Sequence, residues 1–365
     1  MLLMVMRCAE SCCTGVTTGA GLSFSSQKIL VYDIGGTNLR GAVYRVESGT
    51  VGAKIVRPTP NRVSSPAAST GQLYRELLKN IASISREIAE REAISAVSIA
   101  FPGPIDRDGR IVSAPGIWGS NPSGPIDILP DLRLLWPDLP VYICNDLTAA
   151  GYRYLEKNDD SFCVVTVSTG IGSKVFINGE PQLGPNGTGG EIGHVKVLFT
   201  DQAPVCDCGE RGHLQALSSG PAVLRTIRQQ ARIQPQQFET SLLSRIHDRP
   251  ETISNRSIAE AFRAADPFTV AILKQSVRPL AAILTTLHLA LGLERFVLIG
   301  GFALALGEPY RLTLVNFADE LCWQCRTGWD EMIPFGSDDD LSGLIGAGRF
   351  ARAQAAGKPG MTISP

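Results

Sequence analysis

Short apolar runs that end in glycine-rich turns give the two halves of the chain a similar pattern. In the first half, the runs Ile29–Asp33 and Leu39–Val46 flank the turn Gly35-Gly36-Thr37, which predicts a β-hairpin with a glycine tip. In the second half, Cys163–Val167 and Lys174–Ile177 flank another glycine-rich turn in the same way. We therefore expect two hairpins of one kind.

A helix and a strand are predicted after each hairpin. Apolar residues recur with helical period at 71–92 and at 277–291, and the segment 220–292 as a whole is expected to be helical. Strands are expected at 96–100, 141–145 and 296–299, and a last helix with small residues at 341–355. This weak internal duplication predicts two related α/β domains that face a cleft.

The expected boundary between these domains lies near residue 148. The small first domain would comprise 29–147 and about 338–355, because a chain that crosses once at 148 must cross back for its last helix to pack there. The large second domain would comprise 148–337 and carry the Cys/His loop. Residues 1–28, rich in Ser, Thr and Gly, are expected to be a disordered extension, and whether 1–26 belong to the native protein is left open.

Composition excludes several classes of protein. In 365 residues the hydrophobic share is 44% and the charged share 19%, so the chain can bury a sizeable core, and the net charge of -1 gives no basic field for nucleic acid. Nine cysteines in this length do not make a disulfide scaffold. We find no apolar run of membrane-spanning length, and the first 26 residues lack the basic segment of a signal peptide, so we expect a cytoplasmic protein.

Both hairpin tips are expected to bind phosphate, and one later turn is expected to pack against the base or ribose of a nucleotide. Glycines let the backbone approach a phosphate closely, and Asp33, at a strand end, would hold Mg²⁺ through water. Neither tip has the spacing of a P-loop or of GxGxxG, which disfavours Walker-type and Rossmann sites. The expected ATP- or phosphate-binding residues are Gly35, Gly36, Thr37 and Asn38 at the first tip, Ser168, Thr169, Gly170 and Gly172 at the second, and Gly300 and Gly301 after the strand 296–299.

A carboxylate also follows the strand 141–145. In Asn145-Asp146 the aspartate opens onto a run of small residues, where it suits a general base that accepts a proton from an attacking hydroxyl. The alternative is that Asp146 merely caps a helix.

Four metal-type ligands lie close together in the second half. His194, Cys206, Cys208 and His213 give the spacing H-x11-C-x-C-x4-H, which suits a closed tetrahedral zinc site. Cys322 and Cys325 form a second CxxC without a further cluster, so we expect buried thiols there and leave a zinc or redox role open.

Taken in order, these motifs resemble the ROK (repressor, open reading frame, kinase) family of sugar kinases and regulators. The resemblance covers residues 29 to about 350, and its most specific parts are GEIGH (190–194) and the CxCGxxG element at 206–212. It implies the two-domain actin/hexokinase-like (ribonuclease H-like) fold, ATP and Mg²⁺ in the cleft, a structural zinc beside the sugar pocket, and a homodimer. It also implies that Asp146 is the catalytic base and that Gly103, Asn145, Asp146, Glu191, His194 and Gln215 bind the substrate.

Two positions depart from the family pattern. His213 stands where the family usually has a third cysteine, and Gln215 stands where glucose-type members have a glutamate. A carboxylate only accepts hydrogen bonds whereas an amide also donates, so we expect different hydroxyl partners. The alternative is that Gln215 accepts through its carbonyl and changes little.

The predicted function is ATP-dependent phosphorylation of a primary hydroxyl on a hexose-like substrate. These departures favour a non-glucose sugar or a seven-carbon carbocyclic cyclitol of the valienone or valiolone type, with glucokinase or N-acylmannosamine kinase as the alternative. A ROK transcriptional regulator is disfavoured, because only 28 residues precede the first strand where such proteins carry a helix-turn-helix.

Overall fold

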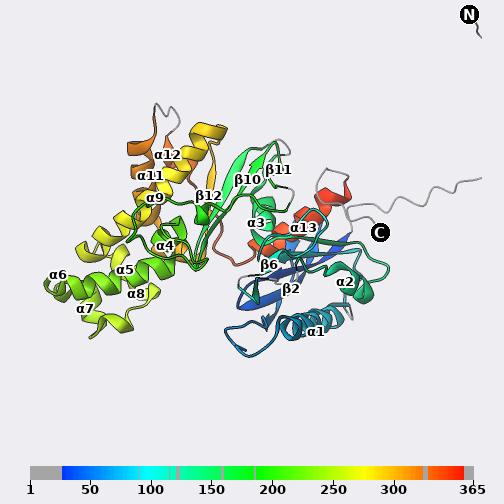
Figure 1. The fold of residues 1–365 in the computed structure, drawn as a ribbon. Helices are drawn as coiled ribbons and strands as arrows, with labels where there is room; N and C mark the ends of the chain where they lie inside the picture. The colour runs from blue at the N-terminus through cyan, green and yellow to red at the C-terminus, as the bar shows by residue number, and fades with distance from the viewer. Residues whose placement is uncertain are drawn as a thin grey trace, which may run out of the picture.

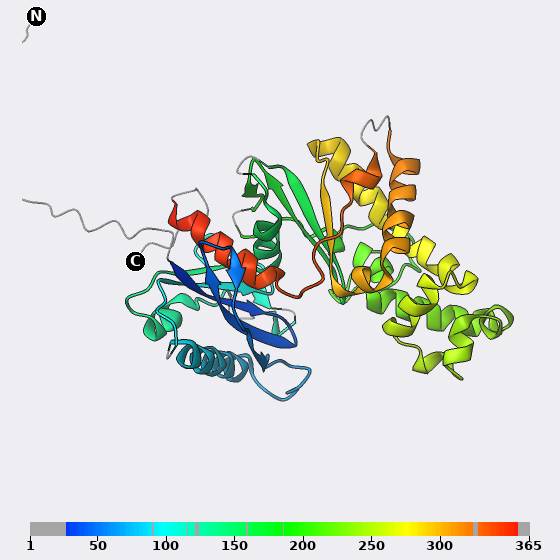
Figure 2. The same ribbon diagram turned by 180° about the vertical axis from the view of Figure 1, so that it is seen from behind.

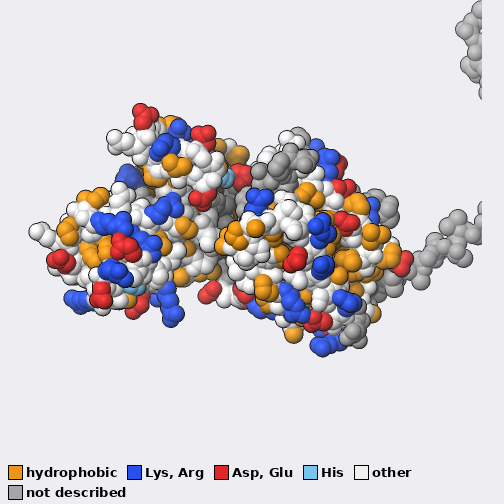
Figure 3. All heavy atoms as spheres, turned by 60° about the horizontal axis from the view of Figure 1, so that its bottom comes forward, with side chains coloured by type: hydrophobic (Ala, Val, Ile, Leu, Met, Phe, Trp, Pro, Cys, Tyr) orange, Lys and Arg blue, Asp and Glu red, His pale blue; other side chains and the backbone are white. Residues whose placement is uncertain are grey.

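The computed structural model describes residues 27–356, apart from 90, 115, 121–123, 158–159, 185 and 324–327. Residues 1–26 of the expected extension and Cys325 lie outside these residues, whereas Lys28, also part of the expected extension, begins the first strand. The described chain forms two lobes, each built on one large β-sheet (Figure 1). In the space-filling view of Figure 3 the lobes are joined at a narrower waist, and acidic and basic side chains are interspersed on the face shown.

The first sheet holds the first predicted hairpin. Its strand order is β3-β2-β1-β5-β8, with β4 also paired to β2. The hairpin strands β1 and β2 are antiparallel, whereas β5 and β8 run parallel to β1. The strands are β1 Lys28–Ile34, β2 Asn38–Arg45, β3 Thr50–Val51, β4 Ile55–Pro58, β5 Ala96–Phe101 and β8 Val141–Asn145.

The second sheet repeats this arrangement on a smaller scale. Its order is β11-β10-β9-β12, in which β9 and β10 form an antiparallel hairpin and β12 pairs in parallel with β9. The strands are β9 Phe162–Val167, β10 Ile171–Ile177, β11 Glu180–Pro181 and β12 Phe296–Ile299, and a separate ribbon pairs β6 Ser113–Ala114 with β7 Gly119–Ser120. Both predicted hairpins are therefore present, and each has a parallel strand beside it.

Helices cover the outer faces of both sheets and fill the space between them. Leu77 and Ile81 of α1 (Thr70–Ala89) pack with Leu132 of α2 (Leu129–Leu135) in the core of the first lobe. The second lobe carries α4 Leu214–Ser218, α5 Gly220–Ile233, α6 Pro235–Glu239, α7 Leu242–Ile246, α8 Asn255–Arg263, α9 Pro267–Leu291, α10 Gly301–Leu306, α11 Glu308–Leu321 and α12 Trp329–Met332. Short 3-10 turns lie at η2 Ile192–His194 and η3 Pro250–Thr252.

Helix α9 is the one described helix that is long and apolar enough to cross a membrane by length and composition. This finding differs from our expectation of no apolar run of membrane-spanning length. Leu273, Val277 and Leu280 of α9 are fully buried in the core of the second lobe, and α9 packs against α11. We therefore interpret α9 as a core helix.

Two helices connect the lobes. Helix α3 (Asp146–Tyr154) leads from the first sheet toward the second, and α13 (Ser342–Ala355) returns to pack against α3, β1 and β5 (Figure 2). The two helices come so close that a Cβ atom on Gly346 would lie 1.7 Å from the carbonyl oxygen of Ala149. One apolar cluster joins α3, α13 and the facing sides of both sheets. The boundary expected near residue 148 falls inside α3, so the division into domains stays a proposal.

Candidate functional site

Two carboxylates lie at the ends of two strands of the first sheet, β1 and β8, with β5 between them. Asp33 of β1 pairs with Ala100 of β5, which in turn pairs with Cys144 of β8. Asp33 therefore lies level with Cys144, two residues before Asp146. Two strand spacings separate β1 from β8, about 10 Å. The parallel strands thus bring both acids to one edge of the sheet.

The start of α3 is capped by Asn145. Its Oδ1 accepts from the backbone N–H groups of Leu147 (3.0 Å) and Thr148 (3.2 Å). Its Nδ2 donates to the carbonyl oxygen of Gly103 and to Oδ1 of Asp146, each at 2.9 Å. The alternative in which Asp146 is the helix cap is therefore wrong, because the residue before it satisfies the free N–H groups.

These hydrogen bonds leave one oxygen of Asp146 available. Oδ1 accepts from Nδ2 of Asn145 and from the N–H of Leu147, whereas Oδ2 takes no hydrogen bond from a described residue. Burial raises the pKa of Asp146 to about 7, and the charge of Asp33 adds to the effect. The N–H of Leu147 and the ammonium of Lys174 oppose it. A carboxylate with this pKa suits general-base work near neutral pH.

Asp33 is held between a cation and a helix. Nη1 of Arg40 lies 3.3 Å from Oδ2 of Asp33. Burial raises the pKa of Asp33, and Arg40 opposes this rise. At the start of α13, a Cβ atom on Gly343 would come within 2.4 Å of the Asp33 carboxyl carbon, so only glycine fits at 343 with Asp33 in this position.

The first glycine tip is a tight turn. The N–H of Gly35 donates to the carbonyl oxygen of Asn38 at 2.9 Å. Nδ2 of Asn61 holds the carbonyl of Gly36 at 2.8 Å. Thr37 is exposed at the tip, where its hydroxyl can meet a ligand.

The second tip is packed against two other turns. The N–H of Ser168 donates to the carbonyl of Gly170, and the N–H of Gly220 donates to the carbonyl of Ser168, both at 2.9 Å. Gly300 has φ 100°, and a Cβ atom there would lie 2.6 Å from the carbonyl oxygen of Val167. The structure thus brings the expected residues 168–172 and 300–301 together, and adds Gly220, which the sequence pattern did not single out.

Gln215 lies between this tip and the GEIGH loop. Its Oε1 accepts from the N–H of Ile171 at 3.4 Å, and a Cβ atom on Gly193 would lie 3.4 Å from the same oxygen. Glu191, which precedes η2, is exposed. The carbonyl end of the Gln215 amide therefore faces protein, which leaves the amide nitrogen as the end available to a ligand.

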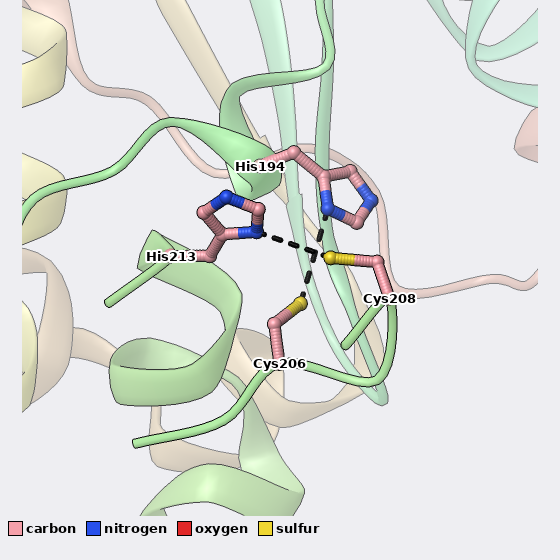
Figure 4. Close-up of side chains that lie close together, drawn as sticks. All are labelled: His194, Cys206, Cys208 and His213. Atoms are coloured by element: carbon pink, nitrogen blue, oxygen red, sulfur yellow. Dashed lines mark hydrogen bonds between the residues drawn. The ribbon is translucent and has the colours of Figure 1, made fainter. Parts of the chain in front are cut away.

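The four predicted metal ligands form one cluster (Figure 4). The ligand atoms of His194, Cys206, Cys208 and His213 all lie within 4.8 Å of one another. Nδ1 of His194 faces Sγ of Cys206 at 3.8 Å, and Nδ1 of His213 faces Sγ of Cys208 at 3.2 Å. Two thiols and two imidazoles at such separations fit tetrahedral zinc.

The second CxxC differs from our expectation. Cys322 is half-buried rather than buried, because it ends α11 at the edge of the core. Its predicted partner Cys325 lies outside the described residues.

Sequence reasoning missed Arg40, Gly343 and Lys174. The sequence pattern predicts a strand that starts at Lys174, but β10 begins three residues earlier, at Ile171, and this puts the lysine in mid-strand. The signal that could have found it is a single charged residue within a strand that otherwise holds only uncharged residues.

Comparisons with known proteins agree with this arrangement. The sequence profile of the ROK family matches residues 30–353. A C(7)-cyclitol 7-kinase of Streptomyces hygroscopicus subsp. limoneus is 38% identical over 89% of this chain and 94% of its own. A 2-epi-5-epi-valiolone 7-kinase of Actinoplanes sp. is 33% identical over 79% and 81%. Among solved structures, the ROK hexokinase of Thermus thermophilus is 27% identical, with a TM-score of 0.68 over 91% of this chain and 100% of that one.

The two lobes with their duplicated hairpins define a two-domain α/β protein of the actin/hexokinase type. The chain belongs to the ROK family. The predicted family and fold are therefore confirmed, and so is the predicted class of enzyme, an ATP-dependent kinase.

Proposed function

We propose that this protein transfers the γ-phosphoryl group of ATP to the primary hydroxyl of a seven-carbon cyclitol. One observation carries the proposal: Asp146, with a pKa of about 7 and an oxygen that accepts no hydrogen bond from a described residue, lies after β8 at the same sheet edge as Asp33 of β1. The two relatives with the highest identity among those described above support a cyclitol as acceptor, since one is named a C(7)-cyclitol 7-kinase and the other a 2-epi-5-epi-valiolone 7-kinase.

In the proposed reaction Asp146 acts as the base. Its Oδ2 accepts the proton of the acceptor hydroxyl, the acceptor oxygen forms a bond to the γ-phosphorus, and the bond from that phosphorus to the β-phosphate oxygen breaks to release ADP. Asp146 need not be a strong base, because phosphoryl transfer depends mainly on the positions of the two reactants and on neutralisation of the charge on the phosphoryl group.

The two glycine tips would hold the phosphates. The first tip joins β1 to β2 and the second joins β9 to β10, so each lobe contributes one. Asp33 would hold Mg²⁺ through water, and Mg²⁺ bound there would neutralise charge on the transferred group. Closure of the lobes would exclude water that otherwise hydrolyses ATP.

The acceptor ring would be bound by five residues: Gly103, Asn145, Glu191, His194 and Gln215. Both the Nδ2 and the Oδ1 of Asn145 already form hydrogen bonds within the protein. An acceptor hydroxyl would therefore share the N–H donors of Asn145 with these protein groups. Gln215 presents its amide nitrogen, which donates where the glutamate of glucose-type members only accepts. This difference favours a cyclitol over glucose.

The Cys/His cluster would bind a structural zinc. His194, Cys206, Cys208 and His213 would be its ligands, and zinc would tie the GEIGH loop to the start of α4. The fixed loop would then present Glu191 to the acceptor.

The protein would be a homodimer in the cytoplasm and would bind neither nucleic acid nor membrane. Light scattering on the purified protein would give its mass directly, and a monomeric mass would remove the dimer from the proposal without affecting the reaction.

The test is a panel of acceptors assayed by coupled ADP release. It should include 2-epi-5-epi-valiolone, another C7-cyclitol, glucose and N-acetylmannosamine, with mass spectrometry of each product. We expect kcat/KM for a cyclitol to exceed that for glucose by about 10-fold or more, the usual discrimination from one or two polar contacts. Glucose turnover at about 10⁴ M⁻¹s⁻¹ or better, an ordinary enzyme efficiency, would replace the cyclitol with plain glucokinase.

A further inference from the structure

Lys174 is the one buried Lys or Arg among the described residues, with 1% of its surface exposed. Burying an ammonium group is unfavourable unless it is hydrogen-bonded and paired with negative charge. The reaction described above does not use this side chain. Its surroundings show what it does.

Strand alternation directs Lys174 toward α3. In β10 the residues two before and two after it face that helix: a Cβ atom on Gly172 would touch Leu147, and Phe176 lies against Gly151. Side chains at i and i+2 share one face of a strand, so Lys174 lies on the same face, between these two contacts. This puts its stem beside the first turns of α3, which begins at Asp146.

The ammonium group ends on the loop that carries Glu191. Nζ of Lys174 donates to the carbonyl oxygen of Gly189. The neighbouring Ser173 holds the next residue, since both its backbone N–H (3.0 Å) and its Oγ (2.8 Å) donate to the carbonyl of Gly190. Two consecutive residues of β10 thus fix the two residues that precede Glu191.

The charges around Lys174 are those of the proposed site. Burial lowers the pKa of Lys174, while Glu191, then Asp146, Cys144 and Cys163, act in the opposite direction. The groups acting on Asp146 are Asp33 from β1, Lys174 from β10 and Glu191 from the loop, and Cys144 of β8 interacts with it as well. Among these groups Lys174 is the cation.

We propose that Lys174 is a positioning residue of the phosphoryl-transfer site, which holds the Gly189–Glu191 segment by its hydrogen bond and brings a positive charge to the start of α3, where Asp146 lies. This inference rests on the proposed function. It separates two effects of one ammonium group: the hydrogen bond acts on acceptor binding, and the charge acts on the base.

Three variants separate these effects. Lys174→Met removes both, Lys174→Gln keeps a donor for the Gly189 carbonyl but loses the charge, and Ser173→Ala loosens the same loop without a change of charge. The acid limb of the kcat/KM profile should move upward by about one pH unit in both Lys174 variants and stay in place in Ser173→Ala, because an opposite charge nearby stabilises a carboxylate by about that much or more. Acceptor KM should rise about 10-fold in Lys174→Met and in Ser173→Ala, and less in Lys174→Gln, while the KM for ATP changes little.

An acid limb that stays in place in both Lys174 variants would overturn the proposal. So would failure of both variants to fold, since Lys174 would then serve only the fold. A wild-type enzyme that phosphorylates no acceptor would refute the proposed function but not this inference, which has a second readout without turnover. This readout compares melting temperatures across pH for wild type and for Lys174→Gln, each with and without Asp146→Asn. The pH at which the effect of Asp146→Asn changes reports the pKa of Asp146, and this pH must be higher in Lys174→Gln than in wild type.

Discussion

Asp33 and Asp146 act on each other across two strand spacings of one sheet, and the charge of Asp33 raises the pKa of Asp146. The relationship follows from the parallel alignment of β1, β5 and β8, which ends all three strands at one edge. In the proposed reaction, one of these two acids would hold Mg²⁺ and the other would accept the proton. The predictions below test its parts.

Replacing Asp146 by Asn should abolish most turnover and leave the fold and ATP binding intact. We expect kcat to fall about 10²–10⁴-fold, the usual contribution of one general base. Calorimetric binding of ATP should be unchanged. Asp248→Asn, at an exposed aspartate, is the matched control and should keep full activity. A residual rate above a tenth of wild type would remove Asp146 from the mechanism.

The same substitution should stabilise the protein, and more so at high pH. Because the pKa of Asp146 is raised to about 7 in the folded state, the folded chain holds a proton that the unfolded chain releases above its ordinary pKa near 4. Wild type therefore loses stability as pH rises from about 4 to 7, whereas Asp146→Asn does not. The melting temperature of the variant should exceed that of wild type more at pH 8 than at pH 5, and an equal difference at both values would contradict the raised pKa.

The protonation of Asp146 determines the direction in which kcat/KM changes with pH. Asp146 accepts a proton only when it is ionised, so kcat/KM should fall tenfold per unit below a pKa of about 7. Measurement between pH 5 and 9 checks this. A limb near pH 4 would show that another group limits the rate.

Metal analysis should find about one zinc per chain. Cys206→Ala should lose the metal and lower the melting temperature, because a structural zinc site contributes folding free energy. Cys322→Ala, which removes a half-buried thiol outside the cluster, should keep the metal. Metal-free protein that stays folded and fully active would rule out a structural zinc.

Gln215→Glu should shift specificity toward glucose. Its Oε1 can still accept from the N–H of Ile171, but the donor end becomes a second acceptor. We expect kcat/KM to rise for glucose and to fall for a cyclitol, each by about 1–3 kcal/mol in transition-state binding. Gln229→Glu, on the exposed side of α5, is the control. Equal changes for both acceptors would exclude Gln215 from discrimination.

Most elements could be predicted from the sequence, because hairpins with glycine tips and amphipathic helices are local signals. The carboxylates also followed from local position, since Asp33 and Asp146 come at the ends of apolar runs. The contacts of Arg40, Lys174 and Gly343 could not be predicted. They depend on which strand face turns inward and on where α13 crosses back, and both are set by packing between segments far apart in the sequence.

The contact between Gly346 and Ala149 has a consequence for how this chain can change over generations. A single methyl group at 346 would overlap the Ala149 carbonyl oxygen. The size of residue 346 is therefore limited by the position of the α3 backbone at residue 149. A larger residue at 346 becomes acceptable only after α3 moves away, and that same helix begins with Asp146. Any lineage that loosens this crossing must therefore also readjust the position of Asp146.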